Sequence, residues 1–284
     1  MLQRKSTQLL LRTQRLNYKN SMKLKGFLLL IFGLISALTY GQGFSVSPSR
    51  ITLKGRPGQT VSQIITFSND GNSNISLIAS VKDFYRDSTG VKHYSPAGSR
   101  ASSNGNWISF SEGALELKKN EKKSLTLTMT IPPDESATSL TNSMVFFTQV
   151  KEQTSANQGS GVAINVLMEV GVQVYHVPEG LRSEGLEFIA FEDKGFVAQS
   201  RQVAIKLRNP GQLNQDAYVR FELTGIETGE EIPVDAVPVA MLPKAEQWII
   251  INLPASLKGR YLAVAILDAG RQYDLKVAEK EILY

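Results

Sequence analysis

ITFSNDG, residues 65–71, and IKLRNPG, residues 205–211, are two versions of one motif that lie 140 positions apart. In each copy alternate apolar residues lead into an Asn-x-Gly corner, which is the pattern of a β-strand that ends at a turn. A second pair, LTMTIP at 127–132 and IIINLP at 249–254, lies 122 positions apart. Such repeats indicate that one structural unit occurs twice, and the difference of 18 between the two spacings predicts an insertion in the first copy. The polar residues 86–106 supply that insertion.

Short runs rich in β-branched and aromatic residues follow one another after residue 42, each bounded by Gly, Asn, Asp or Pro, and none has a sustained helical period. The runs predict an all-β protein built of sandwiches or barrels, and together with the repeat they favour two β-sandwich domains in tandem after an N-terminal signal peptide. Tyr261, which follows Gly259 at the start of a late run, is expected to tie the preceding loop to its strand as a tyrosine corner. The predicted strands are 59–68, 74–84, 115–132, 143–150, 162–175, 201–208, 217–225, 246–254 and 260–267.

The first 41 residues have the composition of an export signal. They carry seven Lys or Arg and no Asp or Glu, and then the apolar run GFLLLIFGLISAL, which is too short to span a bilayer but has the length of a signal-peptide core. A retained short anchor is the alternative. We therefore divide the chain into a leader and signal peptide at 1–41, a first sandwich at 42–178, a linker at 179–185 and a second sandwich at 186–284.

The charge and cysteine content bound the function. The formal net charge of +5 comes from the leader, because residues 42–284 hold 24 of the 31 basic residues against all 26 acidic ones. Residues 42–284 therefore have a net charge of about −2, which does not indicate the basic surface that nucleic-acid binding requires. The chain has no cysteine, so it folds without disulfides. We expect a periplasmic protein with no integral membrane span after signal cleavage, or alternatively a secreted or cell-surface protein.

Catalytic chemistry is sparse in this sequence. The two histidines, His93 in the insertion and His176 near the linker, are interpreted as solvated loop imidazoles, and no G-x-S-x-G elbow is present. Without cysteine or clustered histidine the usual zinc spacings do not occur. Asp83 and Asp87 lack the glutamate that a calcium loop requires. We therefore predict no enzyme, no catalytic residue, no metal and no cofactor.

Two segments carry the candidate binding features. In GFSVSPSRITL, residues 43–53, the apolar parity changes at Pro48, which predicts an edge strand that leaves its first sheet, with Arg50 near the change. In VAINVLMEVGVQVY, residues 162–175, seven alternate positions are apolar, so this strand is expected to run past its own core and offer an edge for pairing with another chain. The alternatives are a solvated edge-strand cation for Arg50 and a buried last strand for 162–175.

These features resemble the periplasmic pilus and fimbrial assembly chaperones, the PapD-like family of two immunoglobulin-like domains. The resemblance covers residues 44–180 and rests on VSPSRITL, the Asn-Asp-Gly corner, and the stretch from Trp107 that leads to a long strand ending at Pro178. It implies that Arg50 anchors the C-terminal carboxylate of a client and that alternate apolar residues of the long strand fill the client's groove. The matching positions on the long strand are Ile164, Val166 and Met168, with Gln173 where the family has a lysine.

The function predicted from this resemblance is a non-enzymatic, periplasmic, chaperone-like protein that binds exported subunits by β-strand addition. Its partner would be an exported protein subunit, pilin-like or otherwise β-rich, and the long strand also offers a route to self-association. The alternative is a structural or adhesive envelope or cell-surface module. In one variant of that alternative, GRYLAVAILDAG at 259–270 with the end VAEKEILY at 277–284 faintly resembles the C-terminal sorting domains of the type IX secretion pathway.

Overall fold

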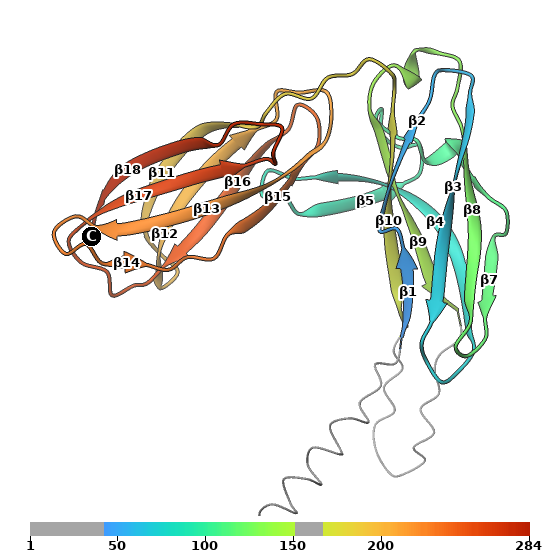
Figure 1. Cartoon of the computed structure of the whole chain (residues 1–284), viewed down its shortest axis with the longest axis horizontal. Helices are drawn as coiled ribbons and strands as arrows, with labels where there is room; N and C mark the ends of the chain where they lie inside the picture. Colours follow the sequence, from blue (N-terminus) through green and yellow to red (C-terminus); the bar gives the residue numbers. More distant parts are fainter. Residues whose placement is uncertain (1–42, 151–166) are drawn as a thin grey trace, which may run out of the picture.

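The computed structural model describes residues 43–150 and 167–284, which form two β-sandwiches (Figure 1). The predicted all-β class is confirmed, and helical structure in the described residues is confined to the short 3-10 turns η1, Gly105–Trp107, and η2, Glu135–Ala137. No described helix is long and apolar enough to cross a membrane. The signal peptide expected at 1–41 lies outside the described residues.

The first sandwich packs a four-stranded sheet, in the order β1-β3-β8-β6, against a six-stranded sheet, in the order β2-β10-β9-β4-β5 with β7 beside β4. Phe67 of one sheet and Phe147 of the other meet edge to face at 4.7 Å between ring centroids in the middle of this core. The strands are β1 Phe44–Ser47, β2 Arg50–Lys54, β3 Thr60–Asn69, β4 Ile75–Arg86, β5 Lys92–Pro96, β6 Ile108–Phe110, β7 Ala114–Leu117, β8 Lys122–Thr130, β9 Thr141–Gln149 and β10 Glu169–Val177.

The second sandwich packs the sheet β11-β12-β16 against the sheet β14-β13-β17-β18, with β15 beside β13. Figure 1 shows it meeting the first sandwich at an angle near one end. The described residues form no strand between Val177 and Glu187, and residues 179–185, where we place the linker, lie in this interval. The strands are β11 Glu187–Val197, β12 Ser200–Arg208, β13 Gln215–Gly225, β14 Glu231–Ile232, β15 Val237–Met241, β16 Glu246–Leu253, β17 Arg260–Asp268 and β18 Lys276–Leu283.

The predicted change of sheet at Pro48 is confirmed. β1 pairs antiparallel with β3, whereas β2 pairs parallel with β10 in the opposite sheet. Ile51 and Leu53 of β2 are buried in the first core, and Arg50 lies on the other face of the sheet. The switch therefore places Arg50 at the first residue of the strand that lies beside β10.

The repeat motif forms equivalent corners in the two sandwiches. The Asn69 amide donates to the carbonyls of Ser73 and Lys118 at 2.8 and 3.0 Å, and its Oδ1 accepts from Gly71 N at 3.0 Å. Asn209 repeats this set with Leu213 O, Leu242 O and Gly211 N at 2.8, 3.0 and 3.0 Å. Both asparagines are fully buried, so each holds a strand end to the loop that faces it.

The second repeat pair is correct in strand but wrong in register. Ile65 pairs with Leu125 and Ile205 pairs with Ile249, so equivalent residues of β8 and β16 are 124 positions apart and not 122. The predicted alignment was shifted by two residues, which preserves the inward face of a strand and therefore leaves the apolar pattern unchanged. The insertion in the first copy is correspondingly 16 residues and contains β5 and η1.

Two single-residue predictions have opposite outcomes. Tyr261 is buried and its hydroxyl donates to Lys258 O at 3.2 Å, which confirms the tyrosine corner. His176 is not a solvated loop residue, because it lies inside β10, is 0% exposed and donates from Nε2 to Gly55 O at 3.1 Å. The predicted strand ended at 175, and the structure extends it by two residues into this buried position.

Candidate functional site

The outer face of the six-stranded sheet, which looks toward the second sandwich, combines apolar and cationic side chains. Register places Arg50 of β2, Gln173 of β10, Met144 of β9 and Lys82 of β4 in one row across the sheet. A second apolar cluster covers the same face, and three leucines that follow β10 in the sequence pack against it: Leu181, Leu213 and Leu242. The buried members of this cluster are Phe84, Leu140, Met144, Phe146 and Tyr175.

Arg50 is held between the two sandwiches. Its Nη1 donates to Asp216 Oδ2, its Nη2 donates to Asp216 Oδ1 at 3.3 Å, and its Cζ lies 5.9 Å from the centre of the Tyr175 ring. The hydrogen bond to Asp216 is the main reason that the pKa of Arg50 is raised above its ordinary value. The two side chains keep 34% and 52% of their surface exposed. Arg50 therefore already binds a carboxylate, supplied by the chain itself.

Gln173, which stands where the resembling family has a lysine, is the direct neighbour of Arg50 on β10. Its Oε1 accepts a hydrogen bond from the Tyr175 hydroxyl at 2.9 Å. Burial raises the pKa of that hydroxyl to about 12, so Tyr175 remains a neutral donor at physiological pH. Gln173 thus contributes an amide, and no positive charge, beside the arginine.

The edge of β10 next to Arg50 is only partly covered. β2 pairs with Gln173–Val177, and no described strand pairs on that side with Glu169–Val172. Gln149 N donates to Met168 O at 2.9 Å, so the even-numbered residues of this segment bond to β9 and the odd-numbered ones point to the opposite side. Gln173 N confirms this by donating there to Ser49 O at 3.0 Å. The main-chain groups of Glu169 and Gly171 therefore face an open edge that stops at Arg50.

The predicted groove-filling residues are only partly within the described chain. Met168 immediately precedes β10 and is half-buried, whereas Ile164 and Val166 lie outside the described residues. Farther along the same alternating row, Val172 and Val174 are fully buried in the core of the first sandwich. That part of the long strand consequently has the core role that we set out as the alternative.

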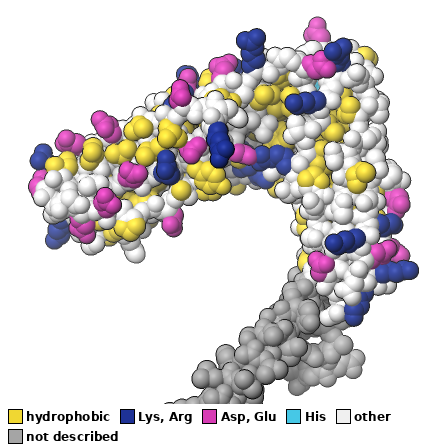
Figure 2. Space-filling view, viewed as in Figure 1, with side chains coloured by type: hydrophobic (Ala, Val, Ile, Leu, Met, Phe, Trp, Pro, Cys, Tyr) yellow, Lys and Arg dark blue, Asp and Glu magenta, His cyan; other side chains and the backbone are white. Residues whose placement is uncertain are grey.

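A pocket of about 730 Å³ lies between the two sandwiches, beside Arg50. From the first sandwich it is lined by Arg50, Arg86 and the turn 89–91, and from the second by Asp216, Trp248 and residues of β15. Figure 2 shows hydrophobic side chains together with Lys or Arg side chains on the inner side of the bend between the sandwiches. Asp216 is the one carboxylate among the described residues that line this pocket.

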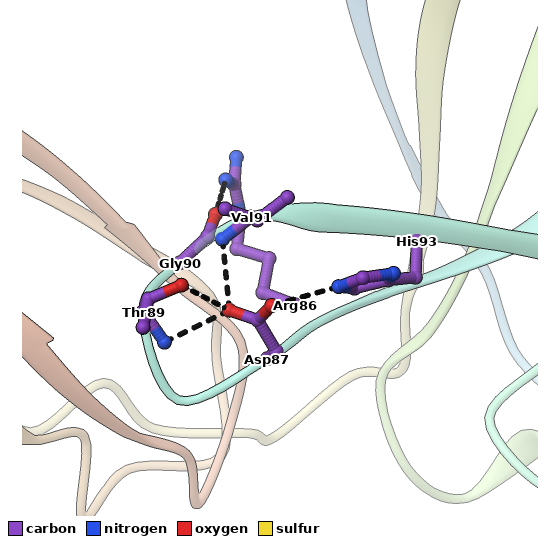
Figure 3. Close-up of polar contacts among 6 residues, drawn as sticks. All are labelled: Arg86, Asp87, Thr89, Gly90, Val91 and His93. Carbon is purple, nitrogen blue, oxygen red and sulfur yellow. Dashed lines mark hydrogen bonds and ion pairs between the residues drawn. The ribbon is translucent and has the colours of Figure 1, made fainter.

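The β4–β5 hairpin that borders the pocket has a rigid tip (Figure 3). Asp87 accepts from Thr89 N at 2.8 Å, Val91 N at 3.1 Å and His93 Nε2 at 2.7 Å, and these bonds, the one from His93 above all, hold the pKa of Asp87 well below its usual range. At the tip, Ser88 O accepts a 2.6 Å hydrogen bond from Trp248 N of β16. The hairpin thus docks the first sandwich onto the second.

Sequence reasoning did not find three of the residues that form this site: Tyr175, Asp216 and Arg86. Asp216 is 166 positions from its partner Arg50, and its neighbours in sequence give no signal for the contact. Arg86 and Lys92 flank DSTGV, and this turn signal could have identified them as facing residues of a hairpin. In the described part of the chain no group of histidine, aspartate and glutamate side chains could hold a metal ion.

Comparison with known proteins gives no match to a protein-family model and none to a curated protein. Among solved structures, a chaperone–tip subunit complex of the Csu pili of Acinetobacter baumannii is 14% identical, with a TM-score of 0.48 over 84% of this chain and 97% of that one. The class 5 fimbriae chaperone CfaA is 14% identical, with a TM-score of 0.44 over 85% and 100%. The E. coli chaperone DraB is 15% identical, with a TM-score of 0.42 over 85% and 98%.

Proposed function

We propose that this protein is a non-enzymatic, periplasmic, chaperone-like protein that binds an exported β-rich subunit by strand addition. The observation that carries the proposal is the open edge of β10, where Glu169 and Gly171 present their main-chain groups and where the edge ends at Arg50. An open edge beside alternating side chains supports recognition of an extended segment, because main-chain bonds give affinity and side chains give selectivity.

The orientation of the added strand follows from the position of the arginine. β10 runs from Glu169 toward Val177, and Arg50 lies level with Gln173. A client strand whose terminal carboxylate lies at Arg50 and whose preceding residues line the open edge would run parallel to β10, as β2 does. The client strand would therefore lie on the same side of β10 as β2 and pair with the segment that precedes Gln173.

The carboxylate anchor is supported by the bond that Arg50 already makes. Its two Nη atoms bind both oxygens of Asp216, which is the bidentate geometry in which arginine recognises a carboxylate. The pair is partly exposed, so its net contribution is below about 1 kcal/mol and a competing carboxylate can displace it. We infer that a client terminus takes the place of Asp216 on Arg50.

The test compares two forms of one defined peptide. An N-acetylated peptide of alternating threonine and valine, made soluble with an N-terminal ethylene glycol tail, is prepared with a free C-terminal carboxylate and as the C-terminal amide. Each peptide is titrated into the exported chain, residues 42–284. The acid form should bind about fivefold more tightly than the amide form, because an arginine–carboxylate bond is stronger than an arginine–amide bond. Arg50→Ala should remove this difference while the amide form binds as before.

Equal affinity of the two forms for the wild-type chain would exclude the carboxylate anchor. Absence of binding by either form would exclude strand addition and favour the structural or adhesive module. A second copy of the chain bound at the same edge would appear as dimerisation that the peptide competes away.

A further inference from the structure

We infer that Arg86 and Lys92, the facing residues at the end of the β4–β5 hairpin, form one anion site with Arg50 and supply the positive charge that Gln173 does not. The inference rests on the proposed function, and it assigns binding residues that neither the sequence motif nor the resemblance contains. It commits the site to a terminal carboxylate that lies between β2 and the hairpin.

The hairpin places both cations on the face of the sheet that carries Arg50. Arg86 and Lys92 are register partners, and Phe84, two residues before Arg86, lies on the same face as Tyr175, with ring centroids 6.1 Å apart. The Lys92 Nζ atom lies 5.8 Å from the centre of the Phe84 ring. Arg86 and Arg50 line the same pocket. Because alternate residues of a strand share a face, these positions bring three cations together across the sheet.

Among the residues that the structure describes, the three cations have too few counterions. Arg86 donates one hydrogen bond, from Nη1 to Gly90 O at 2.7 Å, and within residues 43–150 and 167–284 neither Arg86 nor Lys92 makes an ion pair. Asp216 alone among the described lining residues carries negative charge, and Arg50 binds it. The cluster consequently attracts an anion to the space between its members.

The mutual repulsion of these cations is visible at Lys92. Burial lowers the pKa of Lys92, and the charges of Arg86 and Arg50 lower it further. A bound carboxylate would relieve that repulsion. The free protein therefore retains an unfavourable grouping of charge that the client would neutralise, which is the usual relation between a binding site and the stability of its host.

The hairpin that carries Arg86 and Lys92 is held by several hydrogen bonds, which favours a binding site over an accidental cluster of cations. Asp87 closes the hairpin tip through bonds to Thr89, Val91 and His93, as Figure 3 shows, and Ser88 anchors the tip to Trp248. The Asp87 carboxylate thus accepts its hydrogen bonds from groups of the hairpin itself. Arg86 and Lys92 thus project from a fixed hairpin, so little conformational freedom is lost when they bind an anion.

The experiment uses the acid and amide peptides described above with three variants of the exported chain. Arg86→Gln and Lys92→Met should each weaken binding of the acid peptide by about twofold, which is part of the fivefold preference of the wild type, and leave binding of the amide peptide unchanged. Arg100→Gln is the matched control, because Arg100 stacks on the Tyr85 ring, 4.3 Å from its centre, and Tyr85 points to the opposite face of β4 from Phe84, on which Lys92 lies.

A stability measurement separates binding from folding. Lys92→Met should melt at the same temperature as the wild type or higher, since it removes a charge that the free protein disfavours, yet it should bind the acid peptide less tightly. If Arg50→Ala abolishes the acid preference while Arg86→Gln and Lys92→Met keep it, the inference is overturned and the proposed function stands. If the wild type shows no acid preference, the proposed function fails and the inference fails with it.

Discussion

His176 is a fully buried imidazole in β10, and it makes the stability of the first sandwich depend on pH. Burial lowers its pKa, and the bond to Gly55 O offsets only part of that effect. The pKa returns to its ordinary value of about 6.5 when the chain unfolds. At lower pH the unfolded chain therefore binds more protons than the folded chain. The free energy of unfolding has its full value above pH ~6.5 and falls as the pH drops below it.

The measurement is best made in a His93→Gln background, where His176 is the one remaining histidine. Between pH values of about 6.5 and 5.5 the free energy of unfolding should fall by up to about 1 kcal/mol, because the histidine of the unfolded chain is half protonated at the upper pH and almost fully protonated at the lower one. Adding His176→Phe, which keeps a ring beside Trp107, should remove this decrease. A double variant with the same pH dependence as its parent would assign the effect to other groups.

The resemblance implied client-binding roles for Arg50 and Gln173, and the structure places these two residues level on adjacent strands. It missed Asp216 because that contact depends on how the two sandwiches meet, which no local pattern encodes. It also misassigned His176, since the apolar alternation ends at Val174 and gives no reason to continue the strand.

At the scale of the strand, the open edge of β10 predicts that proline has opposite effects at adjacent positions. The Glu169 N–H points away from β9, and proline at the first residue of a strand is tolerated on such an edge. The Glu169→Pro variant should therefore keep the melting temperature of the wild type. It should bind the alternating threonine–valine peptide about threefold to tenfold less tightly, which is the cost of one main-chain hydrogen bond. Val170→Pro should lower the stability instead, because the Val170 N–H belongs to the ladder with β9.

Glu169→Gln is the control for the side chain, since the Glu169 carboxylate accepts a hydrogen bond from Thr148 at 2.6 Å. Binding of the peptide should be unaffected by this change. Should Glu169→Pro bind the peptide as the wild type does, the added strand does not use this edge.

The strands that sequence reasoning predicted well are those with unbroken alternation, such as β3, β12 and β13. It missed β11, where register shifts at Phe188–Ala190 and Asp193–Gly195 break the period of two. The two-residue error in the β8–β16 alignment has a related cause, because a shift of two leaves every side chain on its original face. Pattern thus determines which face of a strand is inward but not its register.

At the scale of the whole molecule, Arg50 has two roles, because it joins the sandwiches through Asp216 and is the proposed client anchor. Other contacts also hold the sandwiches together, namely the bond from Trp248 N to Ser88 O and the apolar cluster that Leu181, Leu213 and Leu242 cover. Release of Asp216 should therefore loosen the angle between the sandwiches without separating them.

Asp216→Asn tests both roles in one variant. Removing the internal carboxylate should tighten binding of the acid peptide by about threefold, which corresponds to the small net value of a partly exposed ion pair. Small-angle X-ray scattering should show a wider range of inter-sandwich distances than in the free wild type, and saturating acid peptide should widen the range in the wild type similarly. Asp235→Asn, an exposed position outside the pocket, should change neither property. Tighter binding without a change in the distance distribution would mean that Asp216 competes with the client but does not set the angle between the sandwiches.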